Sequence, residues 1–348
     1  MEKLSCADPS VGVTGNSERP AFASTYAIAG RLISILSPDE HSQTLFRHYF
    51  SGWHSASVSN SIDNQPHATI FVRGRIPPKA PQHLPSFEVA DGGLCHADET
   101  TYYFRNHSSV VAASGRSPRV DVWFGEDEPV RERQAIARLI FNAAMTAMRR
   151  CGLYELHGAG LVAPDGTGIL VSGPSGSGKS TLATQLASVG WHYLSDDSLL
   201  LGESERGIEA HALRRVFALT ESGVTTARGF DVQLPPTIVE SFDPLKQRFE
   251  PADVFPNRFA IQCLPKKLFF SRITQEAATR NRPLSPAETM AQLLRMCPWA
   301  AYDKAVAEPH LRVLEKLARQ AAGFELLAGK DLLGDPDLTA DYLLHPPN

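Results

Sequence analysis

The residues best suited to chemistry lie between Ile169 and Leu201. The segment Gly173-Pro174-Ser175-Gly176-Ser177-Gly178-Lys179-Ser180 fits the pattern G-x-x-x-x-G-K-[ST] in full. Glycines let such a loop wrap so that its backbone N–H groups face phosphate oxygens, and the following helix start adds partial positive charge. In this pattern the lysine reaches the β- and γ-phosphates and the hydroxyl ligates Mg²⁺. The loop, together with Thr181, is therefore predicted to bind the phosphates of a nucleotide.

A pair of aspartates, Asp196 and Asp197, begins seventeen residues after Lys179. Ten helical residues from Ser180 climb about 15 Å. The five extended residues of the segment WHYLS return about 16 Å. We therefore expect both aspartates to finish level with the phosphate loop, at the end of the sheet where ligands of open α/β folds bind.

Two carboxylates at that place have two available roles. One can hold Mg²⁺, directly or through a water molecule, and the other can accept a proton from an attacking hydroxyl. The predicted metal ligands are Ser180, Asp196 and Asp197, and the two aspartate roles are not assigned individually. The alternative is a turn that contains two aspartates, or one metal-binding aspartate with an idle neighbour.

His157 is the third candidate of this region. The apolar runs on either side of Pro164-Asp165-Gly166 predict a β-hairpin. A hairpin centred between Asp165 and Gly166 pairs residue 157 with residue 174, at the start of the phosphate loop. His157 would there contact phosphate or hydrogen-bond an aspartate. The alternative is a structural histidine at a strand end.

The composition limits the function classes. The chain has 348 residues and a formal net charge of −4, with no long basic run, so we expect neither nucleic-acid nor membrane binding. Its five cysteines are dispersed, without a C-x-x-C pair, which is typical of reduced thiols in a cytoplasmic protein. Neither a signal peptide nor a long apolar run is visible in the sequence.

Turn signals and hydrophobic patterns predict an α/β protein of two parts. Residues 1–20 are predicted to be loose, and residues 21–130 to form a small α+β module of unknown role, in which the run from Thr25 to Leu36 is expected to be one strand. Residues 131–348 are predicted to form a P-loop kinase domain, with a linking helix over 131–150 and a core over 151–335. In that core, Ser285 and Glu288 predict a capping box at the start of a helix.

The stretch HGAGLV…GTGILVSGPSGSGKSTLATQLASVGWHYLSDDSLLL resembles the HPr kinase/phosphorylase family and its related proteins. The resemblance implies a core similar to that of phosphoenolpyruvate carboxykinase. It also implies transfer of the γ-phosphate of ATP, with Mg²⁺, to a serine of a protein or peptide. By matching position, His157, Lys179, Asp196 and Asp197 would be catalytic. The acceptor, HPr or another peptide, stays open, and an oligomer is possible.

The sequence also leaves other functions and other site residues open. A nucleotide-gated binding module, or a simple ATPase without an acceptor, is the main alternative. A small-molecule kinase is less favoured because the chain has no dense arginine lid, and an ABC-type ATPase because it has no L-S-G-G-Q segment. An arginine usually stabilises the transferring phosphoryl group, and the options are Arg214, Arg215 and Arg258. Glu209 is a further option for Mg²⁺.

Overall fold

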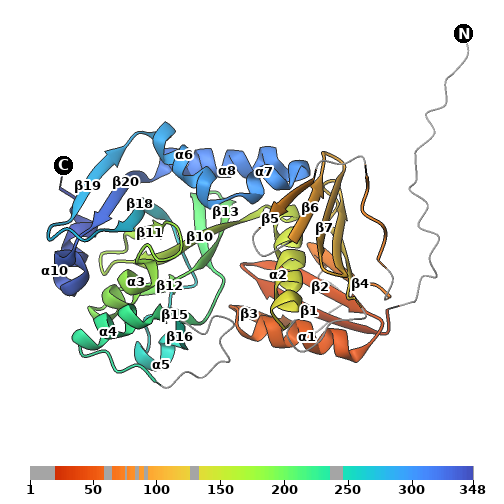
Figure 1. Ribbon diagram of the computed structural model, residues 1–348, viewed down its shortest axis with the longest axis horizontal. Coiled ribbons are helices and arrows are strands. Elements are labelled where there is room, and N and C mark those ends of the chain that lie inside the picture. The colour runs from red at the N-terminus through yellow and green to blue at the C-terminus, as the bar shows by residue number, and fades with distance from the viewer. Residues whose placement is uncertain are drawn as a thin grey trace, which may run out of the picture.

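The computed structural model describes residues 20–58, 65–74, 77–82, 86–89, 93–125, 133–235 and 246–347. Of the predicted loose N-terminus, residues 1–19 lie outside the described part. The described chain forms two large mixed β-sheets with helices packed on them, which is an α/β architecture. Figure 1 shows the two sheets as neighbouring lobes.

The first lobe is built on a sheet with the strand order β3-β1-β2-β4-β9-β8-β7-β6-β5. Its strands are β1 (Phe22–Ile28), β2 (Arg31–Ser37), β3 (Ser55–Val58), β4 (Ala68–Val72), β5 (Ser86–Val89), β6 (Gly93–Ala97), β7 (Thr101–Asn106), β8 (Ser109–Ser114) and β9 (Arg119–Trp123). Helix α1 (Glu40–Ser51) follows β2, and its N-cap Asp39 accepts a hydrogen bond from the Ser42 amide at 2.7 Å.

Helix α2 (Arg133–Arg150) lies across this sheet (Figure 1). Its buried side chains, among them Leu139, Ile140 and Met148, belong to the same hydrophobic core as the first sheet and α1. We therefore call β1–β9, α1 and α2 the N-terminal lobe. The proposed boundary between the module and the kinase domain remains a prediction.

The second lobe is built on a sheet with the order β17-β14-β13-β10-β11-β18-β20-β19, and β12 also pairs with β10. Its strands are β10 (Leu153–Val162), β11 (Gly168–Ser172), β12 (His192–Ser195), β13 (Ser198–Ser204), β14 (Gly207–Ala212), β17 (Gln262–Cys263), β18 (Pro265–Ile273), β19 (Arg280–Leu284) and β20 (Ala322–Ala328). The neighbours β11, β18 and β20 are parallel, so their carboxyl ends share one edge. A separate pair, β15 (Phe217–Thr220) and β16 (Lys246–Phe249), stands beside this sheet.

Helices cover both faces of the second sheet. They are α3 (Lys179–Ser188), α4 (Glu221–Gly229), α5 (Pro251–Val254), α6 (Pro286–Met296), α7 (Trp299–Tyr302), the 3₁₀ turn η3 (Lys304–Val306), α8 (Ala307–Gln320), α9 (Lys330–Gly334) and α10 (Pro336–Leu344). One core packs α3, α4, α9 and α10 against the sheet, and the other packs α6 and α8 on the opposite face. The capping box of Ser285 and Glu288 at the start of α6 is confirmed.

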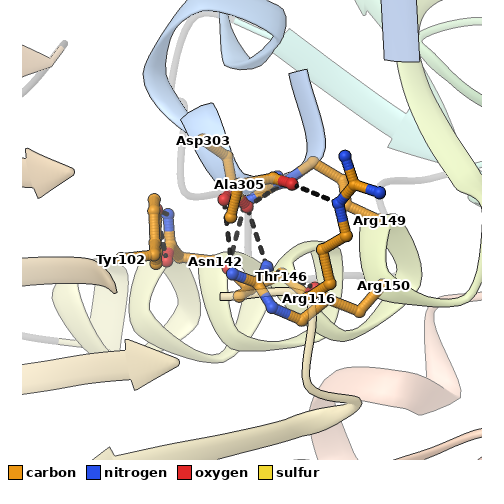
Figure 2. A network of polar contacts seen from close by, with 8 residues as sticks. All are labelled: Tyr102, Arg116, Asn142, Thr146, Arg149, Arg150, Asp303 and Ala305. Atoms are coloured by element: carbon orange, nitrogen blue, oxygen red, sulfur yellow. Dashed lines mark hydrogen bonds and ion pairs between the residues drawn. The ribbon is translucent and has the colours of Figure 1, made fainter. Parts of the chain in front are cut away.

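A polar network joins the two lobes at the end of α2 (Figure 2). The Asp303 carboxylate is fully buried and accepts from Arg149 Nε at 2.9 Å and from Arg150 Nη1 at 2.8 Å. Arg116, between β8 and β9, donates to the Ala305 carbonyl at 3.0 Å. Breaking a buried ion pair leaves an uncompensated buried charge, which destabilises the fold. The network therefore holds α2 firmly against the segment that contains α7 and η3.

Two sequence expectations need correction. The run from Thr25 to Leu36, expected as one strand, is the hairpin β1–β2, because Ala29 and Gly30 adopt φ values of 47° and 74°. The hairpin β10–β11 pairs Gly158 with Ser172, so its register differs by one residue from the expected one.

The reason for the shifted register lies in Pro164. A two-residue turn would need an N–H at this position, and proline has none. The chain instead forms a three-residue loop, Pro164 to Gly166, which the Ala163 amide closes by donating to the Thr167 carbonyl at 3.0 Å. In this register the strand position opposite His157 is residue 173, which still places His157 beside the phosphate loop.

Among the helices that the structure describes, none combines the length and apolar character required to cross a membrane.

Candidate active site

The loop of residues 173–178 connects β11 to α3 at the shared carboxyl edge of the parallel strands. Gly173 is tightly enclosed, because a Cβ there would lie 2.6 Å from both the Ser177 hydroxyl and the Ser271 carbonyl oxygen. Gly178 adopts a φ of 92°, a conformation that L-residues avoid. The loop geometry thus depends on these glycines, as expected of a loop whose backbone wraps around phosphate.

Lys179, the first residue of α3, is buried, and its ammonium folds back onto the loop. Its Nζ donates to the carbonyl oxygens of Gly173 at 2.8 Å and of Pro174 at 3.0 Å. Burial lowers its pKa, and the nearby Asp197 and Asp196 charges oppose that shift. A phosphate bound at the loop would exchange these carbonyl contacts for stronger charge-assisted hydrogen bonds.

The remaining predicted loop residues divide by exposure. Ser175 and Gly176 are exposed at the tip of the loop. Ser177 is buried, and its hydroxyl accepts from Ser271 Oγ at 3.3 Å. Thr181 faces α4, where a Cβ on Gly223 would lie 3.2 Å from its hydroxyl. Ser177 therefore supports the loop, whereas the exposed tip is open to a ligand.

Asp196 lies at the end of β12, almost fully buried. Its Oδ2 accepts from the Ala218 amide of β15 at 2.9 Å, and its Oδ1 has no hydrogen-bond partner among the described residues. Burial raises its pKa to about 6 and the Asp197 charge adds to this, while the Ala218 amide and the Ser180 hydroxyl act in the opposite direction. A buried carboxylate oxygen without a partner beside a serine hydroxyl is an arrangement that a cation would complete.

Mg²⁺ fits these donors. It prefers oxygen ligands and is usually held by one or two carboxylates together with phosphate oxygens and water. Within the described residues no group of three or more His, Cys, Asp and Glu side chains is placed to hold a metal alone. Ser180 and Asp196 would therefore bind the ion jointly with the phosphates of a nucleotide.

Asp197 is surrounded by different partners. Its Oδ1 lies 3.4 Å from His157 Nδ1, and its Oδ2 lies 3.3 Å from Arg214 Nη1. Ser198 Oγ donates to the same Oδ2 at 3.2 Å. Burial would raise the pKa of Asp197, but Arg214, His157 and Lys179 outweigh it and hold that pKa below its ordinary value. This carboxylate is ionised at neutral pH and about one third exposed, so it is an accessible base.

His157 is neutral at the same pH. Burial lowers its pKa, Asp197 opposes this shift, and the cations Lys179 and Arg214 reinforce it. A neutral imidazole beside Asp197 accepts or donates a single hydrogen bond without adding charge. The structure thus brings His157, Lys179, Asp196 and Asp197 to one site.

The three arginine options have different surroundings. Only Arg214 among them contacts an aspartate of the pair. Arg215 pairs with Glu250 at 3.1 Å, and Arg258 donates to the Gly190 carbonyl at 3.0 Å. Glu209, the other metal option, pairs with Arg206 at 3.0 Å. Arg214 is therefore the arginine of this site.

Sequence reasoning missed two groups near Arg214. Glu155 precedes His157 by two residues on β10 and therefore shares its face of the strand. Its Oε2 is buried without a hydrogen-bond partner among the described residues, and burial raises its pKa to about 7 against the effect of Arg149 and Arg214. Tyr49 of α1 is the second group: burial raises its pKa to about 12, and among the charged groups Arg214 opposes this shift most strongly. Strand alternation from His157 identifies Glu155, but no local pattern indicates Tyr49.

Comparisons with known proteins find a weak structural similarity. No protein-family model matches the sequence, and no curated protein matches it. Among solved structures, the HPr(Ser) kinase/phosphatase from Coxiella burnetii aligns over 55% of this chain and 93% of its own, with 12% sequence identity and a TM-score of 0.28. Similarity at this level leaves function to be inferred from the residues of the site.

Proposed function

We propose that this protein is a kinase that transfers the γ-phosphate of ATP to a serine hydroxyl of a protein or peptide. One observation carries the proposal. Beside a phosphate loop with a buried lysine stand two aspartates with opposite surroundings. Asp196, near Ser180, has a buried oxygen without a hydrogen-bond partner among the described residues, and Asp197 is ionised and paired with Arg214. Simple nucleotide binding requires only the first of these two aspartates, Asp196.

The two aspartates have different roles in this proposal. Ser180 and Asp196 would hold Mg²⁺, which would neutralise charge on the phosphates when bound. Asp197 orients the acceptor hydroxyl and accepts its proton. The hydroxyl oxygen forms a bond to the γ-phosphorus as the bond from that phosphorus to the bridging oxygen breaks, and ADP leaves with the electron pair. Lys179 and Arg214 stabilise the charge on the transferring group.

His157 has a supporting part. As a neutral imidazole against Oδ1 of Asp197, it keeps one carboxylate oxygen oriented and leaves the other side of the carboxylate to the acceptor. In this proposal its removal impairs transfer less than removal of Asp197 does.

A nucleotide-gated binding module is the second candidate, and the contact of Asp197 with Arg214 is compatible with it as a structural ion pair. The test uses γ-labelled ATP with Mg²⁺ and a peptide library centred on serine, with an alanine-centred library as the control. The kinase proposal predicts label on the serine library alone. Tight MgATP binding with no label on any serine peptide or on HPr would favour the binding module.

A further inference from the structure

The N-terminal lobe and the candidate active site meet at Arg214. Its Nη1 lies 3.3 Å from Asp197 Oδ2, and its guanidinium carbon lies 5.8 Å from the centre of the Phe141 ring of α2. Burial disfavours its charge, but Asp197, Tyr49 and Glu155 outweigh this effect and raise its pKa. The arginine therefore remains a cation that connects a carboxylate of one lobe to an aromatic ring of the other.

The backbone of Arg214 is fixed by the N-terminal lobe as well. The segment after α1 runs antiparallel to residues 213–215: the His54 amide donates to the Leu213 carbonyl at 2.8 Å, and the Arg215 amide donates to the Gly52 carbonyl at 3.0 Å. These hydrogen bonds flank Arg214 on both sides. The direction in which its side chain leaves the backbone is thus set by contacts outside the second lobe.

The residue opposite Arg214 in this short ladder is Trp53, which is buried. Its ring contacts Tyr49 at 5.3 Å, Phe50 at 5.0 Å and Phe141 at 6.1 Å between ring centres. Such aromatic pairs stabilise one relative orientation of their elements. The cluster therefore joins α1, α2 and the Arg214 ladder into one packed unit.

Helix α2, which carries Phe141, is itself immobilised. Arg149 and Arg150 at its end bind the buried Asp303 of the second lobe (Figure 2). The Arg149 guanidinium also lies 5.1 Å from the Trp299 ring centre. The ring of Phe141 consequently keeps a fixed place relative to the candidate active site.

From these contacts we propose that the N-terminal lobe is a part of the active site: Phe141 is a positioning residue that holds the Arg214 guanidinium against Asp197. The proposal rests on the kinase function proposed above and assigns a role to the lobe. The acceptor and nucleotide need not touch the lobe for this role. A ligand or partner that displaced the lobe would release Arg214 and slow phosphoryl transfer without emptying the phosphate loop.

The first test is the rate at which phenylglyoxal modifies Arg214 in the full-length protein, measured by mass spectrometry. Phe141→Leu keeps an apolar side chain but removes the aromatic face. We expect it to speed the modification by about 2- to 30-fold, the range that corresponds to one cation–π contact. The matched control is Phe71→Leu, which removes a ring from the same lobe that contacts Arg73 at 4.8 Å and Arg119 at 4.5 Å. This control should leave the modification rate of Arg214 unchanged.

The second test is a double-mutant cycle on phosphoryl transfer. Phe141→Leu should lower kcat by a similar factor without changing the MgATP dissociation constant. In an Arg214→Ala background, which itself should lose about 100-fold or more, it should have no further effect, because its influence passes through the arginine. Thermal melts establish that each variant is folded.

The outcomes separate the two proposals. Unchanged modification of Arg214 in Phe141→Leu, or equal losses of kcat with and without Arg214, would overturn the positioning role. Faster modification of Arg214 in a protein that transfers no phosphate would support the positioning contact while the kinase proposal fails. Faster modification with an unchanged kcat would remove the link between Arg214 and catalysis.

Discussion

Asp196 and Asp197 are adjacent in the chain, yet their surroundings shift their pKa values in opposite directions. Burial raises the pKa of Asp196 to about 6, whereas Arg214 with His157 and Lys179 holds that of Asp197 below its ordinary value against its own burial. Titratable neighbours whose environments separate them in this way are typical of sites that assign them different chemical roles.

This difference predicts opposite effects of asparagine on stability in metal-free protein. Asp196→Asn removes a costly buried charge and keeps an oxygen for the Ala218 amide, so it should raise the free energy of unfolding by about 1–3 kcal/mol. Asp197→Asn leaves Arg214 without its carboxylate and should lower the free energy of unfolding by about 1–3 kcal/mol. Urea unfolding at neutral pH measures both changes in the free energy of unfolding. Changes of the same sign would contradict the environments assigned to the two carboxylates.

The phosphate loop allows a matched pair of glycine substitutions. In Gly173→Ala the new Cβ meets the Ser271 carbonyl oxygen at 2.6 Å, and backbone cannot yield cheaply. We expect at least a tenfold loss of MgATP affinity by titration calorimetry, since about 1.4 kcal/mol of distortion is enough for that. Gly176→Ala has open space around its Cβ and should retain more affinity, despite a φ of 80°. Equal losses would show that space at Gly173 is not the constraint.

His310 predicts a loss of stability in mild acid. Its ring is stacked on Tyr154, and neither nitrogen has a hydrogen-bond partner among the described residues. Burial lowers its pKa to about 3, Arg149 adds to this, and Asp303 opposes it. Since the unfolded chain binds a proton near pH 6.5 and the folded chain does not, the stability that this residue contributes is present above that pH and falls as the pH decreases toward 3.

When the pH falls from 7 to 5, this single group should lower the free energy of unfolding by about 2 kcal/mol. His310→Phe should therefore reduce the difference in unfolding free energy between these two pH values, while the exposed His41→Phe should leave it unchanged. Melts or urea titrations at both pH values provide the comparison. An identical pH dependence in wild type and His310→Phe would show that the buried imidazole does not control it.

Local signals predicted the elements that carry the site. The capping box of Ser285 and Glu288 and the strand before Gly173 were found because each depends on a few neighbouring residues. The return of Asp196 to the level of Ser180 followed from the rise per residue of one helix and one strand. The turn at Ala29 and Gly30 was missed because alanine seldom adopts a positive φ.

The features that the sequence did not predict depend on tertiary contacts. Arg214 was one of three equal options until the ladder with residues 52–54 and the contact with Asp197 distinguished it. Glu155 was overlooked because its burial, which raises its pKa, comes from elements distant in the chain. No periodicity in the region of Tyr49 or Phe141 indicates that the N-terminal lobe reaches the site.

The central claim is that Asp197 accepts the proton of an acceptor hydroxyl. The most direct measurement is single-turnover transfer from γ-labelled ATP to a serine peptide, with MgATP affinity measured in parallel, for wild type and Asp197→Asn. Loss of a general base should reduce the transfer rate by about 100- to 10,000-fold, with nucleotide affinity nearly unchanged because Lys179 and the loop are intact. Transfer at the wild-type rate in Asp197→Asn would contradict the account.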